Sequence, residues 1–364
     1  NLIIDEVPIA ITKNIVRRYA ERDQGEIYEP FEILPKVTTK LKDNVIIFSD
    51  DTPKKVSVEV RAGANNLKGD VRLFAPKNWT VSPKMILFEI DKKSDKQTVE
   101  FLVTPPKHQS EGKLEAIVTS NQKMYDKELV EINYNHIPKQ SVLLNSEAKV
   151  VRLNIEKVGN YIGYIKGAGD AIPESLRQIG YTVLEINPSE ITQKNLDTFD
   201  AIVVGIRAYN VVKELKFKQK HLLEYVKKGG NMIVQYNTSR RVDVAAPYPL
   251  KLSRDRVTDE FAEVRILAKN HSVLNFPNKI TSKDFEGWVQ ERGLYFPNSW
   301  DENYTPILSM NDKGETPKNG SLLIAKYGKG NYIYTGLSFF RELPAGVSGA
   351  YKLFANMLSV GKGK

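Results

Sequence analysis

The sequence contains no cysteine in its 364 residues. Disulfides, thiolate zinc sites, iron–sulfur clusters and cysteine nucleophiles are therefore excluded from this chain. Long apolar runs are also absent, because none approaches the roughly 20 residues that a membrane-spanning helix needs. Hydrophobic residues make up 41% and charged residues 27% of the chain, which is typical of globular domains and not of disordered or collagen-like chains.

Histidine is scarce, with four in the chain, and no two of them have metal-ligand spacing. Neither His-Glu-x-x-His nor Gly-x-Ser-x-Gly occurs, so we expect no metal or cofactor and no hydrolase elbow. His271, in the segment 270–277, is the histidine in a plausible cleft loop. Two interpretations stay open for it: a catalytic base, or the one we favour, a hydrogen bond that fixes the loop.

Positive charge is distributed unevenly. Residues 1–140 carry 22 Lys+Arg against 21 Asp+Glu, whereas residues 141–364 carry 31 against 23. The basic positions are scattered, and the one dense run, Lys213–Lys220, falls in a predicted helix. A nucleic-acid face needs clustering with aromatic or motif support. We therefore predict a solvated helix face and no nucleic-acid partner.

Residues 44–140 show short alternating apolar runs separated by turn-forming residues, which predicts a small β-sandwich of the immunoglobulin-like (Ig-like) class. Trp79 is expected to fill its core. Residues 1–43 are predicted to supply a leading strand or linker. The predicted strands of the sandwich are 45–48, 55–61, 69–74, 85–90, 98–103, 112–118 and 127–133.

Residues 145–364 alternate strand and helix signals. Apolar strands are predicted at 158–165, 181–186, 199–206 and 231–235, with later ones at 321–325 and 330–336. Helices are predicted at 173–180, 215–228 and 349–358. This order predicts parallel crossovers and a doubly wound α/β sheet.

Ligands of such a sheet bind beyond the carboxyl ends of the strands. Arginine forks, amides and aromatic rings there suit hydroxyl-rich or carboxylate ligands. Each residue also has a structural alternative. Asp170, in the turn 167–170, could belong to a phosphate-binding loop or could cap the next helix. Arg207 could contact a ligand or could pair with an internal carboxylate. Acids and aromatic residues also gather at 284–304, which fits a carbohydrate platform or lid packing. The candidate ligand-binding residues are Asp170, Arg207, Tyr209, Asn210, Tyr236, Asn237, Arg240, His271, Trp288, Glu291 and Arg341.

Four segments, 199–210, 222–236, 284–296 and 328–341, resemble the C-terminal region of secreted PIG-L/LmbE-family N-acetylglucosaminyl deacetylases of the Bacteroidetes type. The resemblance implies an Ig-like sandwich followed by a flavodoxin-like domain similar to class I glutamine amidotransferases. It also implies a preceding zinc-dependent deacetylase domain as partner and a periplasmic or extracellular location. Since the first residue is Asn and no signal segment is visible, we expect a fragment of a longer chain.

Two departures from the family limit the expected activity. The deacetylase motif His-Pro-Asp-Asp-Glu is absent, and the amidotransferase nucleophile is a cysteine, which this chain lacks. We therefore expect a non-catalytic accessory region, without catalytic residues, that binds glycan or orients the catalytic domain. The alternative is a sugar-active enzyme that uses His271, Asp170 or Glu291 as acid or base, provided that these groups converge on one point.

Overall fold

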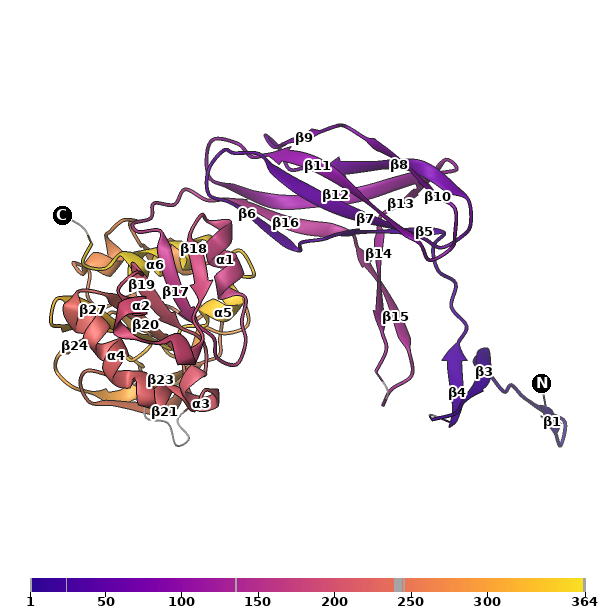
Figure 1. The fold of residues 1–364 in the computed structure, drawn as a ribbon. Coiled ribbons are helices and arrows are strands. Elements are labelled where there is room, and N and C mark those ends of the chain that lie inside the picture. The colour runs from indigo at the N-terminus through magenta and orange to yellow at the C-terminus, as the bar shows by residue number, and fades with distance from the viewer. Residues whose placement is uncertain (1, 24, 135, 239–243, 245, 363–364) are drawn as a thin grey trace. The chain divides into compact units, whose positions relative to one another are not determined.

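The computed structural model describes residues 2–23, 25–134, 136–238, 244 and 246–362. The protein is rich in β-structure and multidomain, with two compact units (Figure 1). The first unit comprises Asn1–Asn44, Thr52–Pro106 and Glu111–Lys149, and the second comprises Val45–Asp51, Lys107–Ser110 and Val150–Lys364. The leading residues, which the sequence suggested as a separate segment, group with the first unit.

A sandwich of two mainly antiparallel sheets forms the body of the first unit. Strand β7 (Lys54–Ala62) shows why the sequence folds this way, because Val56, Val58, Val60 and Ala62 are buried while the residues between them are not. Trp79 is 6% exposed and lies in the core, as expected. One sheet has the order β5 (Val37–Leu41), β7, β11 (Lys96–Thr104), β9 (Thr80–Ser82). The other has the order β10 (Ile86–Ile90), β8 (Leu67–Phe74), β12 (Ser110–Ser120), β16 (Glu147–Arg152), β6 (Val45–Phe48), with β13 (Lys123–Tyr125) paired to β12. By residue range, β6 and the last residues of β16 belong to the second unit.

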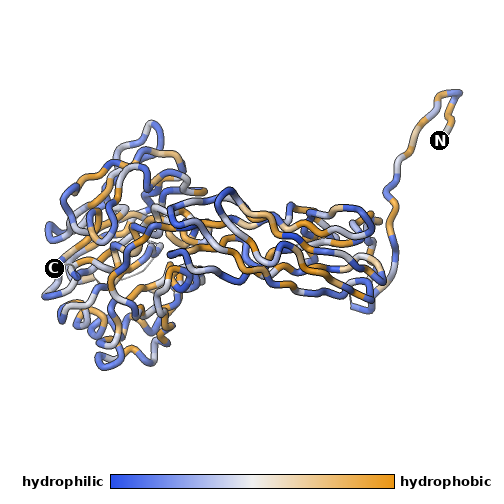
Figure 2. The backbone as a smooth tube through the Cα atoms, turned by 90° about the horizontal axis from the view of Figure 1, so that it is seen from above, coloured by the Kyte–Doolittle hydropathy of each residue, from blue (hydrophilic) through white to orange (hydrophobic). Residues whose placement is uncertain are grey.

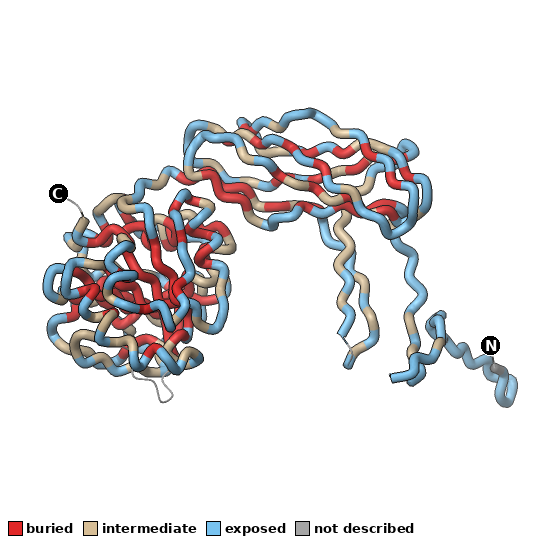
Figure 3. The backbone as a smooth tube through the Cα atoms, in the orientation of Figure 1, coloured by how far each residue is buried: buried red, intermediate tan, exposed pale blue. Residues whose placement is uncertain are grey.

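Hairpins outside the sandwich account for the remaining strands of this unit. Most of their residues are exposed or half-buried, as the blue and tan stretches of Figure 3 show. In Figure 2 the chain leading from the N-terminal end also carries apolar, orange stretches. The hairpins are β1 (Leu2–Ile4) with β2 (Val7–Ile9), β3 (Val16–Glu21) with β4 (Gly25–Pro30), and β14 (Lys127–Ile132) with β15 (Gln140–Asn145).

A seven-stranded sheet organises the second unit. Its first five strands are parallel, and the last two pairings are antiparallel. The order is β18 (Thr182–Glu185), β17 (Tyr161–Ile165), β19 (Ala201–Val204), β20 (Asn231–Gln235), β27 (Gly330–Thr335), β26 (Leu322–Tyr327), β24 (Tyr304–Pro306). Two small sheets accompany it, β21 (Leu250–Val257) with β23 (Gly293–Trp300) and β22 (Arg265–Ile266) with β25 (Leu308–Ser309).

Helices cover both faces of this sheet, because alternate residues of one strand face opposite cores. Ala201 and Val203 of β19 pack in the same core as α1 and α6, whereas Ile202 and Val204 pack in the core of α2 and α4. The helices are α1 (Ile172–Gln178), α2 (Gln193–Leu196), α3 (Ala208–Val211), α4 (Leu215–Lys228), α5 (Phe339–Glu342) and α6 (Ser348–Ser359); the 3-10 turns are η1 (Pro188–Glu190), η2 (Ser272–Leu274) and η3 (Ser282–Phe285).

Strand order reverses around β17. The chain passes from β17 outward to β18 and then returns to β19 on the other side of β17. Such a reversal separates the loops that follow the two strands and is where open parallel sheets bind ligands. The loop after β17 contains Asp170, and the loop after β19 contains Arg207. This position makes the carboxyl ends of β17, β19 and β20 the first place to look for a site.

Candidate functional site at the carboxyl ends of the parallel strands

Asp170 lies at the centre of the reversal. The hydroxyl of Tyr164, near the end of β17, donates to the carboxylate at 2.6 Å from either oxygen. The backbone amides of Ile172 and Ile206 donate to it at 3.1 and 3.4 Å. Burial raises the pKa of Asp170, and these three hydrogen bonds act in the opposite direction. The carboxylate thus joins the first turn of α1 to the end of β19.

The two loops approach each other closely because glycines line them. A Cβ atom on Gly167 would lie 2.0 Å from the carbonyl oxygen of Ile206, and one on Gly205 would lie 2.8 Å from the Tyr164 hydroxyl. Only glycine fits such a backbone approach without displacing the neighbouring loop. Gly167 of the Gly-Ala-Gly-Asp turn is therefore packed against the neighbouring loop, whereas Ala168 and Gly169 are exposed. Asp170 holds the start of α1 through Ile172, although the N-cap residue of that helix is Ala171.

Gln235 closes the polar chain at the end of β20. Its Nε2 donates to the Tyr164 hydroxyl at 3.3 Å, so a row of hydrogen bonds joins the carboxylate in the loop after β17, the phenol of β17 and the amide of β20. The side chain is 1% exposed, and its Oε1 has no hydrogen-bond partner within the described ranges. A buried carbonyl oxygen without a donor is energetically costly. The row Asp170–Tyr164–Gln235 therefore has unused acceptor capacity at its inner end.

Asparagines tie the loops after β19 and β20 together. Asn210 Oδ1 accepts from the backbone amide of Thr238 at 2.9 Å, and Asn210 Nδ2 donates to the carbonyl of the same residue at 3.4 Å. Asn237 Oδ1 accepts from the amide of Tyr209 at 3.0 Å, and Asn237 Nδ2 donates to the carbonyl of Gln235 at 2.9 Å. Asn210 and Asn237 therefore position the loops with their polar groups, and each amide already uses one donor and one acceptor in doing so.

An aromatic group lies beside these loops. Tyr236 stacks on Tyr295 with ring centroids 6.0 Å apart and planes 9° from parallel, and it meets Phe340 at 5.3 Å. The amide of Arg207 donates to the Tyr236 carbonyl at 2.8 Å, and the Arg207 side chain is exposed. Burial raises the pKa of Tyr236, and the nearby Arg207 and Arg341 charges oppose that shift. Tyr236 is 7% exposed and forms the base of this group, whereas Tyr295 and Phe340 are half-buried. We call Tyr236, Tyr295 and Phe340 the aromatic surface.

Arg207 and Tyr295 have backbone conformations that side chains rarely adopt. Arg207 has φ of 54° and precedes α3, and Tyr295, in β23, also has φ of 54°. A non-glycine residue in the left-handed region costs on the order of 1–3 kcal/mol, and such residues concentrate at functional sites. Tyr236 contacts both strained residues, through its backbone carbonyl to Arg207 and through its ring to Tyr295.

A charged pair borders the aromatic surface. Arg341 Nε donates to Glu291 Oε1 at 3.0 Å, Arg341 also bonds Gln290, and its guanidinium carbon lies 4.9 Å from the Phe340 ring centroid. The Glu291 carboxylate thus has an internal cation as partner, whereas Asp170 has a phenol. The two carboxylates belong to separate hydrogen-bonding groups, which does not support a cooperating acid/base pair.

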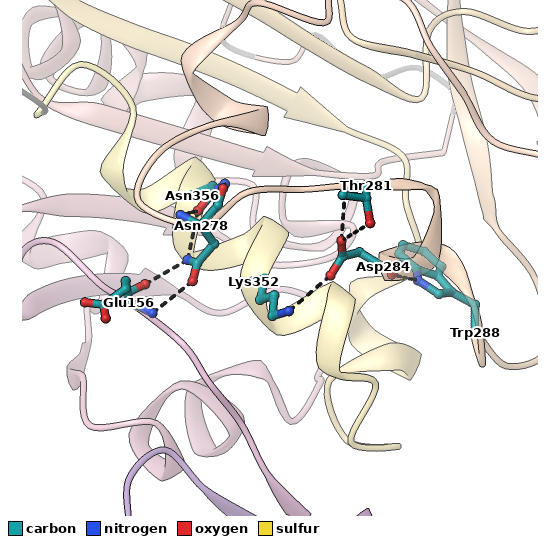
Figure 4. Close-up of polar contacts among 7 residues, drawn as sticks. All are labelled: Glu156, Asn278, Thr281, Asp284, Trp288, Lys352 and Asn356. Carbon is teal, nitrogen blue, oxygen red and sulfur yellow. Dashed lines mark hydrogen bonds and ion pairs between the residues drawn. The ribbon is translucent and has the colours of Figure 1, made fainter. Parts of the chain in front are cut away.

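Trp288 and His271 lie elsewhere. Trp288 is 2% exposed, packs against Phe285 and Phe339, and donates from its indole nitrogen to the Asp284 carbonyl at 3.1 Å (Figure 4). It is a core residue and presents no free ring face. This position does not support its predicted ligand contact.

His271 acts as the N-cap of η2, where its Nδ1 accepts from the amide of Val273 at 3.1 Å. Asn356 of α6 bonds the Val273 carbonyl, and the end of α6 bonds Asn231 at the amino end of β20. His271 therefore belongs to the opposite end of the sheet from Asp170. Its hydrogen bond fixes a loop, and burial lowers its pKa.

Arg240 lies outside the described residues. Two residues of the region, Tyr164 and Gln235, escaped the sequence interpretation, whereas Tyr295 fell within the aromatic and acidic segment 284–304 without being chosen as a candidate. Tyr164 and Gln235 had a usable signal, because each places a polar group at the carboxyl end of a largely apolar, buried strand. Within the described ranges no group of three or more His, Asp or Glu side chains is placed to hold a metal ion. No helix there is both long and apolar enough to cross a membrane.

No protein-family model matches the chain, and neither does any curated protein. Among solved structures it is similar to a family 123 glycoside hydrolase from Clostridium perfringens, at 9% identity and a TM-score of 0.22, over 61% of this chain and 42% of the hydrolase. The exo-beta-1,4-mannosidase Op5Man5 from Opitutaceae bacterium strain TAV5 matches at 11% identity with a TM-score of 0.29, over 56% of this chain and 35% of the mannosidase. The Reelin-N domain of F-spondin matches at 12% identity with a TM-score of 0.19, over 29% of this chain and 84% of that domain. The chain spans less than half of either enzyme, and TM-scores this low carry no argument about activity.

Proposed function

We propose that this chain is a non-catalytic accessory region of a PIG-L/LmbE-type deacetylase that binds glycan at the aromatic surface. In this proposal the first unit is an Ig-like sandwich, and the second is a flavodoxin-like domain related to class I glutamine amidotransferases whose strand-end site has no nucleophile. The supporting observation is the stacked pair Tyr236–Tyr295, in which Tyr295 has a strained backbone and Tyr236 accepts a backbone hydrogen bond from the equally strained Arg207.

The chemistry of that surface suits an amino-sugar oligomer. Aromatic rings present apolar faces that match the C–H faces of a pyranose ring. The exposed guanidinium of Arg207 supplies forked donors for hydroxyl or acetamido oxygens, and the Glu291–Arg341 pair supplies acceptors and donors at the border. Tyr295 and Phe340 are half-buried, so both are fixed by packing and yet accessible. Fixed rings lose little side-chain entropy on binding.

Calorimetric titration with oligomers of N-acetylglucosamine tests the glycan site. We expect Tyr295→Ala and Arg207→Ala each to weaken binding about tenfold or more, which corresponds to roughly 1.4 kcal/mol. Tyr161→Ala is the matched control, because Tyr161 is an exposed aromatic residue at the start of β17, at the opposite end of the strands from the site. Absence of binding, or equal binding by Tyr295→Ala and the unchanged chain, would refute the glycan site.

The accessory role implies a neighbouring catalytic domain and a location outside the cytoplasm. Reading the coding sequence upstream of residue 1 tests both: a domain with His-Pro-Asp-Asp-Glu preceded by a secretion signal is expected. A coding sequence that starts at this chain would remove the accessory role and leave the glycan site to be judged by calorimetry.

A second candidate is a sugar-active enzyme, and the observation in its favour is Asp170. Its half-buried carboxylate has a raised pKa and a tyrosine donor at the strand reversal, which are properties of a general acid. Aryl glycosides of acetylated amino sugars would report this activity. Hydrolysis that is lost in Asp170→Asn and kept in Glu291→Gln would favour the enzyme over the accessory region.

A further inference from the structure

The β14–β15 hairpin has a free edge. It is a two-stranded sheet whose register runs from Lys127↔Asn145 to Ile132↔Gln140. Hairpins of two strands are only marginally stable without a third strand or a covering layer. Strand β15 pairs with β14 alone in the described residues, so the backbone groups on its other side are available for another strand. No residue of either strand is fully buried.

The hairpin is anchored through β14. Glu128 of that strand pairs with Lys40 of β5 at 2.6 Å, and Glu131 pairs with Arg61 of β7 at 2.5 Å. On β15, Ser141 donates to the Glu32 carboxylate at 2.6 Å through its hydroxyl, which leaves the strand's backbone edge unused. The ion pairs therefore fix the inner strand to the sandwich, and β15 is the outer strand of the hairpin.

The composition of β15 is unusual for an exposed edge. Its sequence is Gln-Ser-Val-Leu-Leu-Asn, with neither a charge nor a proline, and Val142, Leu143 and Leu144 are 37%, 40% and 50% exposed. Natural edge strands are commonly protected against pairing by lysine, proline or inward charges. The paired strand β14 has three charged residues, so the absence of charge is specific to the outer strand.

We propose that β15 pairs antiparallel with β15 of a second copy of this chain, around a two-fold axis at Leu143. Leu143 then faces Leu143 of the second copy, Val142 faces Leu144, and Ser141 faces Asn145. The strand order becomes β14–β15–β15–β14, a four-stranded sheet with an isologous interface.

The strand's own sequence identifies a second copy as the partner. Around this axis apolar residues meet apolar residues at the centre, and polar uncharged residues meet at both ends. When a charged strand pairs with its own copy, like charges can meet across the interface, which is destabilising. Strand β15 has no charged residue, so it avoids this repulsion. This inference concerns the first unit and does not depend on the glycan site.

The absence of cysteine makes the pairing directly testable. Leu143→Cys places a thiol at the axis, and cross-strand neighbours come within about 4.5–5.5 Å, close to the spacing that a disulfide spans. Under oxidising conditions we expect a covalent dimer in high yield that reducing agent returns to monomer. Leu87→Cys is the control: Leu87 is exposed on β10, another edge strand of the same unit, and should remain monomeric on the same gel.

Sedimentation velocity of the unmodified chain supplies the second measurement, with a monomer of 41.2 kDa expected to double in mass as concentration rises. Leu143→Lys and Leu143→Glu should each stay monomeric, and an equal mixture of the two should dimerise, because opposite charges then meet at the axis. A misfolded hairpin would not be restored by mixing two defective variants. A monomer at every concentration, a dimer that survives Leu143→Lys, or equal cross-linking of Leu87→Cys and Leu143→Cys would overturn the proposal.

Discussion

Asn278 and Asn356 share a fully used set of hydrogen bonds inside the second unit (Figure 4). Asn356 Oδ1 accepts from both the amide and the Nδ2 of Asn278, at 2.9 Å each, and Asn356 Nδ2 donates to the carbonyls of Val273 and Asn278 at 2.8 and 2.7 Å. Asn278 in turn exchanges two bonds with the backbone of Glu156. Two amides thus join α6, the loop 273–278 and the segment before β17, where no regular ladder links them.

Replacing Asn356 by alanine should destabilise the second unit strongly. The change leaves the Val273 and Asn278 carbonyls and the Asn278 amide without partners in a buried place, where each unpaired group costs about 1–3 kcal/mol. We expect a loss of at least about 3 kcal/mol in the free energy of unfolding, measured by urea denaturation. Asn319→Ala, at an exposed position, should change stability by less than about 0.5 kcal/mol. Equal stability of the two variants would contradict the assigned role.

The Tyr164 hydroxyl is predicted to stabilise the ionised form of Asp170. Tyr164→Phe removes the donor to the carboxylate and the acceptor of Gln235 Nε2, so we expect a loss of about 1–3 kcal/mol. Because a hydrogen bond to the charged form lowers a carboxyl pKa, the pKa of Asp170 should rise further in this variant. A carboxyl titration followed by NMR measures that shift. Tyr161→Phe, on the exposed start of β17, should leave the Asp170 titration unchanged, and a lower pKa in Tyr164→Phe would refute the assignment.

Gly349 should tolerate no side chain. A Cβ atom there would lie 1.8 Å from the carbonyl oxygen of Asp284 and 2.4 Å from its Cα, both backbone atoms. Gly349→Ala normally favours a helix, yet here α6 and η3 would have to separate. We expect a net destabilisation of at least about 2 kcal/mol by thermal or urea unfolding. Ser348→Ala, one residue earlier in the same helix, serves as the control. A Gly349→Ala variant more stable than the unchanged chain would show that Gly349 does not pack tightly against the Asp284 backbone.

Local periodicity predicted much of the fold. The seven runs expected in residues 44–140 fall on β6, β7, β8, β10, β11, β12 and β14, and the helix expected at 215–228 is α4. The sequence interpretation failed where local signals carry no information on pairing. The run at 127–133 forms a separate hairpin with β15 instead of a sandwich strand, and β5, β9 and β16 were not anticipated. Partner choice depends on residues distant in the sequence, such as Lys40 and Arg61 for β14.

The candidate site was predictable in place but not in composition. Parallel strands bring the residues that follow them to one end of the sheet, so Asp170, Arg207 and Tyr236 could be placed together from sequence. Tyr295 and Phe340 come from β23 and α5, whose path to that end depends on tertiary packing. Trp288 could not be distinguished from a binding residue, because the same ring serves a core or a platform.

Glu342 should make stability depend on pH in a direction opposite to that of most carboxylates. Burial raises its pKa from 4.5 to about 8, and the negative charge of Glu260 adds to this rise. The hydrogen bonds from the Val289 amide and the Ser338 hydroxyl, together with the positive charge of Arg292, lower the pKa and so oppose it. Between these two pKa values the folded state holds a proton that the unfolded state releases, so stability falls as pH rises through this window. The fall should amount to a few kcal/mol, since each pKa unit corresponds to about 1.4 kcal/mol.

Glu342→Gln tests this sign. The amide keeps the shape of the protonated acid and does not ionise, so the variant's free energy of unfolding should vary less between about pH 5 and pH 9 than that of the unchanged chain. Urea unfolding at several pH values, monitored by tryptophan fluorescence, measures the difference, and Glu302→Gln at an exposed position controls for the loss of one charge. Because Trp288 packs near the Val289 amide that Glu342 accepts from, its fluorescence reports the same region. Parallel pH curves for Glu342→Gln and the unchanged chain would mean that Glu342 is ionised in the folded state across the whole range.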